Sequence, residues 1–432
     1  MLRLDAGAPG FADDFNALVN GRRESDADVA RDVAQIIAAV REQGDAAVAD
    51  YTRRFDNHDL DADGWQVDPA LCAKARDELP KDLREALELA AERIETFHEK
   101  QKPQDSWTTD SIGATLGSRW TPVDAAGVYV PGGRAAYPSS LLMNAIPAKV
   151  AGVERIVMAT PTRDSALNPA VMAAAAIAGV EEIWCIGGAQ AVAALAYGTE
   201  KIRSVDVITG PGNAWVAEAK RQLYGVVGID MVAGPSEIVV VADKHNNPDW
   251  IAADLLSQAE HDPTSQSILF TDDAAFADAV IAAVERIIPA LATATTAQTS
   301  WAAYGAVVLV PTLEAAMPLV NALAPEHLEL ATDNPDALFA QVKHAGSVFL
   351  GRMTPEAIGD YVAGPNHVLP TGRRARFSSG LSVTDFMKRT SFLSLDDAAL
   401  AAIGPAAVTL AEAEGLPAHA LSVAQRLAPS QA

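Results

Sequence analysis

The chain has 432 residues, of which 49% are hydrophobic, so it is long enough to bury cores in two or more domains. The 33 lysine and arginine residues stand against 56 aspartate and glutamate residues, and the net charge of −23 argues against nucleic acid and anionic membranes as partners. The only cysteines, Cys72 and Cys185, exclude a disulfide framework and a cysteine-ligated zinc site. There is no hydrophobic signal segment at the N-terminus, and no apolar run approaches the roughly 20 residues needed to span a bilayer. We therefore expect a cytoplasmic protein with no membrane partner.

The first 122 residues predict a helical N-terminal region. Apolar residues recur at helical spacing over residues 29–55 and again over residues 82–102, with charged residues between them. We expect residues 1–122 to form a helical scaffold that packs with the second of two α/β domains.

Residues 123–235 predict the first α/β domain. Short apolar segments at residues 127–130, 155–160, 182–188 and 205–210 alternate with alanine-rich segments of helical character. This alternation is typical of βαβ units, so we expect a Rossmann-like domain with a parallel sheet.

A second region of similar design covers residues 236–380. Strand-like apolar segments begin at Ser236, Ser267 and Ala306, and helical segments separate them. The last residues, 381–432, predict a helical tail. The expected fold class is α/β, with two Rossmann-like parallel-sheet domains and helical extensions at both ends.

Two strand-to-helix turns in the first α/β domain are candidates for cofactor binding. Residues 187–190 and 210–213 are rich in glycine and lie where a strand is expected to end and a helix to begin, which is where parallel-sheet proteins bind ligands. Tyr129 lies at a third strand end, where its ring could lie against a flat cofactor ring. Neither turn matches Gly-x-Gly-x-x-Gly, and a tight turn alone also requires glycine, so the binding and the purely structural interpretations both stay open.

The segment before residue 264 predicts a helix that carries two possible metal ligands. Asn247 can cap it, Pro248 suits its first position, and Pro263 prevents continuation far beyond His261. Gln258 and His261 are three residues apart, so their side chains are expected to lie side by side on one face. An amide oxygen and an imidazole there could hold two positions of a metal site, or the pair could belong to a solvated polar face.

Further ionisable residues stand in predicted turns and loops. Glu326 and His327 directly follow a proline and offer two proton acceptors of different basicity if the backbone turns there. Asp360 follows a glycine, while Glu414 and His419 flank a helix corner that contains glycine and proline. Each position alone is also compatible with an ordinary turn or cap. Together they suggest a sulfur-free ligand set suited to Zn²⁺: Gln258, His261, Asp360 and His419.

Three long strings carry a family resemblance: SQAEHDPTSQSILFT, PEHLEL and DYVAGPNHVLPTGRRARFSSGLSVTDFMKRTSF. With them the chain resembles the histidinol dehydrogenase family over nearly its whole length. The resemblance implies a zinc- and NAD-dependent dehydrogenase that oxidises L-histidinol to L-histidine with two NAD⁺ through bound L-histidinal, in the last steps of histidine biosynthesis. It also implies one Zn²⁺ per subunit, two incomplete Rossmann-like domains in an aldehyde-dehydrogenase-like architecture, and an intertwined homodimer.

The resemblance also implies roles for individual residues. The zinc ligands would be Gln258, His261, Asp360 and His419. The acid–base pair would be Glu326 and His327. The substrate would contact Ser236 and Glu414 together with His327 and the zinc ligands, and Glu414 and His419 would enter the active site of the partner subunit. The NAD contacts would be Tyr129, Gln190 and Asn213.

The chemistry of these residues agrees with that activity. Zinc would mainly orient the substrate, His327 can accept the hydroxyl proton, and Glu326 can activate the water that hydrates the aldehyde. Neither cysteine has polar neighbours in the sequence that would suggest a reactive thiolate. The alternatives are a zinc hydrolase that uses no NAD, a zinc- and NAD-dependent dehydrogenase of another small alcohol, and a non-enzymatic binding module.

Overall fold

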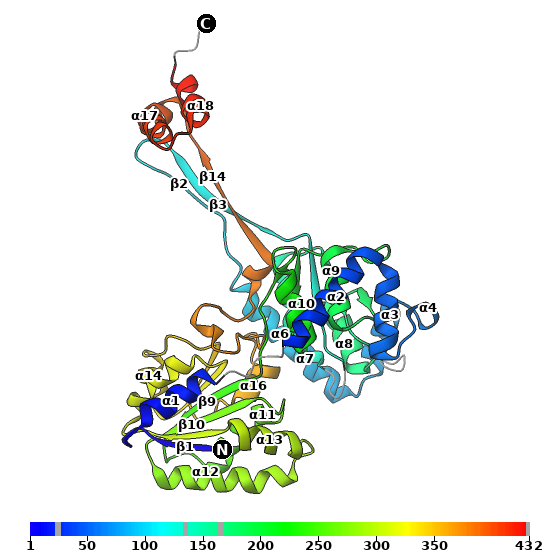
Figure 1. Ribbon diagram of the computed structural model, residues 1–432, viewed down its shortest axis with the longest axis vertical. Coiled ribbons are helices and arrows are strands. Elements are labelled where there is room, and N and C mark those ends of the chain that lie inside the picture. The colour runs from blue at the N-terminus through cyan, green and yellow to red at the C-terminus, as the bar shows by residue number, and fades with distance from the viewer. Residues whose placement is uncertain (22–26, 133–136, 163–166, 429–432) are drawn as a thin grey trace. The chain divides into compact units, whose positions relative to one another are not determined.

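The computed structural model describes residues 1–21, 27–132, 137–162 and 167–428 (Figure 1). The chain forms two compact units. We call residues 1–101 and 124–386 the main unit, and residues 102–123 and 387–432 the small unit. In the part of the chain that the structure describes, no helix is both long and apolar enough to cross a membrane.

The main unit contains a five-stranded parallel sheet in the order β6-β5-β4-β7-β8. Its strands are β4 (Ala125–Tyr129), β5 (Arg155–Ala159), β6 (Glu182–Trp184), β7 (Val207–Thr209) and β8 (Gly228–Ile229). The helices that follow its strands are α7 (Pro138–Ala151), α8 (Pro169–Ala178), α9 (Gly188–Tyr197) and α10 (Ala214–Leu223). The strand order reverses between β4 and β7, which makes that boundary a topological switch point.

The main unit also contains a six-stranded parallel sheet in the order β1-β11-β10-β9-β12-β13. Its strands are β1 (Leu2–Asp5), β9 (Glu237–Ala242), β10 (Gln266–Thr271), β11 (Ala306–Leu309), β12 (His327–Ala331) and β13 (Ser347–Leu350). Ile238 and Val240 pack under α11 (Pro248–Ala259), α12 (Ala274–Ile287) and α13 (Ala294–Tyr304). Val239 and Val241 pack on the other face with α1 (Phe11–Asn20), α14 (Leu313–Leu323) and α15 (Pro335–Phe339). Both faces are covered, which explains the unbroken apolar run of β9. The expected α/β class with two parallel sheets is confirmed.

The N-terminal helices do not all lie where the sequence suggested. Of the N-terminal elements that the structure describes, only β1 is a strand of the six-stranded sheet and only α1 packs in the core on its face. The other helices are α2 (Ala27–Gln43), α3 (Asp45–Asp56), α4 (Leu60–Asp63), α5 (Pro69–Glu78) and α6 (Lys81–Glu99). Among these, α2 and α3 pack on α9, α5 on α8, and α6 on α7, all helices of the first α/β domain rather than the second. Apolar side chains such as Val33 and Val48 belong to that domain's core.

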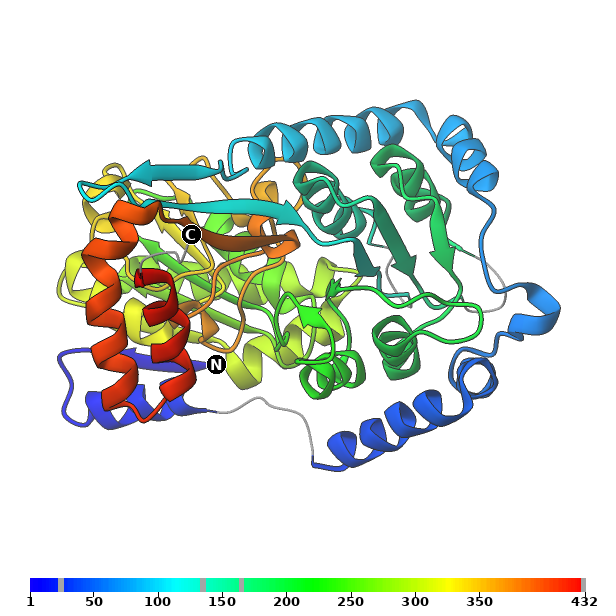
Figure 2. The same cartoon turned by 90° about the horizontal axis from the view of Figure 1, so that it is seen from above.

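The small unit differs from the all-helical character expected for residues 102–122 and 381–432. It holds an antiparallel sheet in the order β14-β3-β2, formed by β2 (Ser106–Thr109), β3 (Thr115–Pro122) and β14 (Met387–Ser394). Figure 2 shows β3 and β14 side by side, with the paired helices α17 (Asp397–Ala413) and α18 (Pro417–Leu427) after them. The sequence did not predict these strands because β3 pairs with β14, which begins only at Met387, far from β3 along the chain.

Short helices complete the described elements. They are η1 (Ile288–Ala290), α16 (Glu356–Tyr361), η2 (Arg374–Arg376) and η3 (Val383–Phe386), all in the main unit. Of these, α16 bears directly on the candidate site.

Candidate active site

Glu326 and His327 come together at the beginning of β12 because the backbone turns sharply before them. Ala324 ends α14 in the left-handed conformation, with φ 45°, and Pro325 leads directly into the strand. Both side chains are buried, and His327 Nδ1 lies 3.8 Å from Glu326 Oε2. The sequence predicted that Glu326 and His327 would act together if the backbone turns before them. The structure contains this turn, and the two side chains lie close together.

The Glu326 carboxyl group lies in a setting that favours its protonated form. Burial raises its pKa well above the usual value, and the nearby carboxylates of Glu237, Asp360 and Glu356 add to the rise. One hydrogen bond opposes this, because the backbone N–H of Glu237 donates to Glu326 Oε2 at 2.9 Å. A buried carboxyl with a perturbed pKa is a candidate acid–base group.

The His327 ring lies between a backbone carbonyl on one side and acidic side chains on the other. Its Nδ1 is 3.1 Å from the carbonyl oxygen of Glu237, while its buried Nε2 has no hydrogen-bond partner. Nε2 lies 3.6 Å from Glu356 Oε1 and 3.9 Å from Asp360 Oδ1. Burial lowers the pKa of His327, so the neutral imidazole is favoured.

Glu356 is a site residue that the sequence analysis missed. It lies one helical turn before Asp360 on α16, and Ser257 Oγ donates to its Oε2 at 2.9 Å, while its buried Oε1 has no partner. His327, Glu356 and Asp360 form a group that could hold a metal ion, with one possible ligand atom from each within 4.8 Å of the others. Burial raises the pKa of Asp360 to about 9, and Glu356 adds to the rise. The i, i+4 spacing of Glu356 and Asp360 is the feature of the sequence that could have predicted two acidic side chains on one helix face.

Gln258 and His261 flank the end of α11. Asn247 caps this helix and Pro248 occupies its first turn, as predicted, but the helix ends at Ala259. His261 therefore lies in the following turn, where its backbone N–H donates to the Gln258 carbonyl oxygen at 3.1 Å, and not on the helix face expected for it. A positive charge on His261 is a further cause that lowers the pKa of His327.

The buried side-chain amide of Gln258 is a candidate metal ligand. The side chain is 1% exposed, yet neither its amide oxygen nor its amide nitrogen has a hydrogen-bond partner. Buried polar groups are normally paired, so this amide, together with the unpartnered Nε2 of His327 and Oε1 of Glu356, needs an explanation. Nitrogen and oxygen donors of this kind fit a divalent metal such as Zn²⁺.

His367 contacts the backbone of Asp360. Its Nδ1 lies 2.9 Å from the Asp360 carbonyl oxygen, and its Nε2 lies 3.4 Å from Ser140 Oγ. Burial is the main cause that lowers the pKa of His367 to about 4, so the ring is neutral at physiological pH. These two contacts give His367 a role in positioning the backbone of Asp360.

The remaining expected substrate residues lie in two places. Ser236 precedes Glu237, the residue whose backbone contacts both Glu326 and His327. Glu414 and His419 belong to the small unit, at the end of α17 and on α18.

The three expected NAD contacts all follow strands of the five-stranded sheet. Tyr129 ends β4 beside the switch point, and it is buried, with its hydroxyl accepting from the Gly188 N–H at 3.0 Å. Burial raises the pKa of Tyr129 to about 12. The ring is thus held at the end of β4 by the turn before α9, and its contact with NAD stays a prediction.

Gln190 and Asn213 offer polar groups at the starts of two helices. Gln190 on α9 is 1% exposed, and its amide oxygen and nitrogen both lack partners. Asn213 caps α10 by accepting from the backbone N–H groups of Trp215 and Val216. Unpartnered amide groups and helix N-termini at a switch point fit a dinucleotide.

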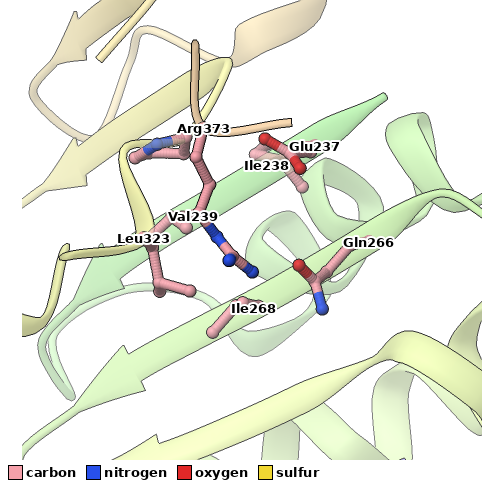
Figure 3. A pocket seen from close by; sticks show the side chains of 8 residues that line it. Glu237, Ile238, Val239, Gln266, Ile268, Leu323 and Arg373 are labelled. Carbon is pink, nitrogen blue, oxygen red and sulfur yellow. The ribbon is translucent and has the colours of Figure 1, made fainter. Parts of the chain in front are cut away.

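A small pocket elsewhere on the six-stranded sheet contains none of the expected site residues. Figure 3 shows Arg373 reaching toward Gln266, with Glu237 beside them. Its other lining residues are Ile238, Val239, Ile268, Leu323 and Pro325. The unpartnered polar atoms, and not this pocket, mark the candidate site.

Comparisons with known proteins agree on one family. The family model described as histidinol dehydrogenase matches residues 20–427. The histidinol dehydrogenase of Zymomonas mobilis is 65% identical over 427 residues, covering 99% of both chains, and that of Caulobacter vibrioides is 60% identical over 419 residues, covering 97% of both. The crystal structure of histidinol dehydrogenase from Elizabethkingia anophelis matches with a TM-score of 0.94 and 35% identity, covering 99% of this chain and 98% of that one. The chain therefore belongs to the histidinol dehydrogenase family.

Proposed function

We propose that the protein oxidises L-histidinol to L-histidine in a zinc-dependent reaction that consumes two NAD⁺ and passes through bound L-histidinal, the last steps of histidine biosynthesis. The observation that carries this proposal is the family match over residues 20–427, together with 65% identity to a histidinol dehydrogenase across 99% of both chains. The buried acid–base pair of Glu326 and His327 supports it chemically.

His327 is the proposed base in both oxidations. Its Nδ1 faces the Glu237 carbonyl oxygen, so Nε2 carries the lone pair that accepts the substrate hydroxyl proton as hydride leaves the carbon. Glu326, in its ionised form, then takes a proton from water as that water adds to the aldehyde, and His327 returns its first proton to the aldehyde oxygen, which leaves a neutral hydrate and a neutral imidazole. His327 accepts the proton of the resulting hydrate while the second hydride leaves. Burial of both groups excludes bulk water from the reactive aldehyde.

The proposed metal ligands are Gln258, His261 and Asp360 of one subunit, and His419 contributed by the partner subunit. Zn²⁺, when bound, supplies a fixed positive charge that orients the imidazole and amine of the substrate. The unpartnered buried amide of Gln258 supports this ligand set. The same four residues, with His327, Ser236 and Glu414, form the proposed substrate-binding site.

Tyr129, Gln190 and Asn213 form the proposed NAD⁺ site, where the bound cofactor accepts hydride. Gln190 supports this role through its unpartnered buried amide. Tyr129 contributes through the Gly188 turn that its hydroxyl holds.

The proposed assembly is a homodimer in which Glu414 and His419 complete the active site of the other subunit. A cytoplasmic location fits the two free, buried thiols of Cys72 and Cys185.

The test is to count NADH formed per L-histidinol consumed by the purified protein, with and without a chelator. Two NADH per substrate, lost on chelation and restored by Zn²⁺, is the expected result. One NADH per substrate would show that the reaction ends at the aldehyde and would contradict the second oxidation. No NADH would overturn the proposal and leave a zinc hydrolase as the better interpretation.

A further inference from the structure

The main unit contains a fully buried ion pair that the proposed chemistry does not use. Lys220 on α10 and Asp230, just after β8, pair with side chains only 2% and 1% exposed. Removing two charges from water costs free energy, and only good geometry with further hydrogen bonds offsets that cost. The other contacts of this pair therefore indicate what it does.

Asp230 Oδ1 accepts from the N–H of the adjacent Met231 at 2.6 Å, and the two remaining hydrogen bonds of the pair both go to Gly210. Lys220 Nζ donates to the Gly210 carbonyl oxygen at 2.9 Å, and the Gly210 N–H donates to Asp230 Oδ2 at 2.8 Å. Gly210 has φ 114°, and a Cβ atom there would lie 2.1 Å from the Tyr129 carbonyl oxygen. Only glycine fits this position. Lys220 binds its carbonyl oxygen and Asp230 binds its N–H.

Gly210 begins the turn that connects β7 to α10 at the switch point of the five-stranded sheet. Asn213 ends that turn, and its side-chain oxygen is occupied by the backbone N–H groups of Trp215 and Val216, at 3.1 and 3.2 Å. Its amide nitrogen is therefore the part of Asn213 that can donate to a ligand. The position of this donor depends on the conformation of residues 210–213.

We infer that Lys220 and Asp230 are positioning residues that hold the 210–213 turn in its NAD⁺-binding conformation before the cofactor arrives. The inference rests on the proposed NAD⁺ chemistry. Both side chains are enclosed and engaged with Gly210, so they act through the turn and do not contact the nucleotide. A turn fixed in advance lowers the ordering cost of binding.

The first experiment measures NAD⁺ binding by calorimetry, without histidinol, to the full-length metal-loaded protein. The variant Lys220→Met/Asp230→Leu removes both charged side chains at once. Apolar replacement of a buried ion pair is often neutral for stability. We expect a folded variant whose Kd for NAD⁺ is about tenfold higher or more, with histidinol binding and zinc content unchanged. A folded variant that binds NAD⁺ like the wild type would overturn the inference.

Arg155 and Glu182 provide the matched control. They form an ion pair in the same sheet with two contacts, at 2.8 and 2.9 Å, where β5 and β6 begin, far from the ends that carry the candidate turns. Arg155→Met/Glu182→Leu should leave the NAD⁺ Kd within about twofold of the wild type. An equal loss of binding in this control would mean that the effect is general destabilisation, against the inference.

A measurement on the wild type decides the question if the double variant does not fold. Hydrogen–deuterium exchange, resolved to the Gly210 amide, should be at least about 100-fold slower than in an exposed loop before any NAD⁺ is added. Fast exchange that slows only with NAD⁺ would overturn the inference. A wild type that binds no NAD⁺ at all would instead refute the proposed function, so the two failures are distinguishable.

Discussion

The Nδ1 of His327 hydrogen-bonds the backbone carbonyl oxygen of Glu237 at 3.1 Å, and this contact selects the nitrogen that can act as a base. A carbonyl oxygen only accepts, so the ring proton resides on Nδ1 and the lone pair on Nε2. Nε2 is buried, has no hydrogen-bond partner, and lies 3.6 Å from Glu356 Oε1. The ring is thus held with its basic nitrogen among the groups proposed to surround the substrate.

The variant His327→Ala should lose most of its turnover and keep its metal. Loss of a general base costs roughly 10²–10⁴-fold in rate. Zinc content, measured by mass spectrometry after gel filtration, should stay near that of the wild type because His327 is assigned to proton transfer. Metal loss would instead make His327 a ligand, together with Glu356 and Asp360 of the same cluster.

The variant His261→Ala should show the opposite pattern. Removing one of four proposed ligands should weaken zinc binding, so the isolated protein should carry well under one Zn²⁺ per subunit, and added Zn²⁺ should restore part of the activity. His344→Ala is a matched control on the same main unit, because His344 lies outside the candidate site. Full zinc occupancy in His261→Ala would contradict the ligand assignment.

The variant Glu326→Gln should separate the two oxidation steps. A glutamine side-chain oxygen can still accept from the Glu237 N–H, which is 2.9 Å from Glu326 Oε2, but the amide cannot take a proton from water. In a single turnover we expect one NADH per site at a rate near that of the wild type. The second NADH should then form about 10²-fold more slowly than in the wild type, or slower still.

Two equivalents formed at wild-type rates would show that another group activates the water. A near-unchanged melting temperature is the check that the hydrogen bond to Glu237 survives in the variant.

The sequence predicted the beginning of α11 well and its end poorly. Asn247 and Pro248 act through local hydrogen bonding and fixed dihedrals, so their effect can be predicted from a few neighbouring residues. The end depends on how the chain must turn to enter β10, which is a property of the whole sheet. His261 consequently approaches the site from a turn and not from a helix face.

Long-range pairing explains the other differences. The strand β3 pairs with β14, which begins only at Met387, while the short strand β2 pairs with β3 alone. The exposed residues of β2 and β14 give no strong apolar alternation that would predict strands. Glu356 was overlooked because an acidic residue early in a helix is usually a solvated one, and only the tertiary structure buries it beside His327. The site residues that were predicted came from a family resemblance and from local spacing.

The buried carboxyl group of Glu329 gives a prediction for stability as a function of pH. Glu329 lies two residues after His327 on β12, is 1% exposed, and forms a side-chain hydrogen bond with Asp254. Burial raises its pKa to about 9, with the charge of Asp254 as the next cause. The folded state therefore binds this proton more tightly than the unfolded state, whose pKa is near the usual 4.5.

The sign follows from proton linkage. Between about pH 4.5 and about pH 9 the folded protein keeps the proton that the unfolded chain releases, so this group makes the free energy of unfolding fall as pH rises. Glu329→Gln, which is neutral in both states, should flatten that fall. The stability of the variant relative to the wild type should rise by about 1 kcal/mol or more across this range, since one pKa unit corresponds to about 1.4 kcal/mol. Denaturant unfolding of the metal-saturated proteins at several pH values measures it, with the exposed Glu285→Gln as the control. Parallel curves for Glu329→Gln and the wild type would show that Glu329 is ionised in the folded protein.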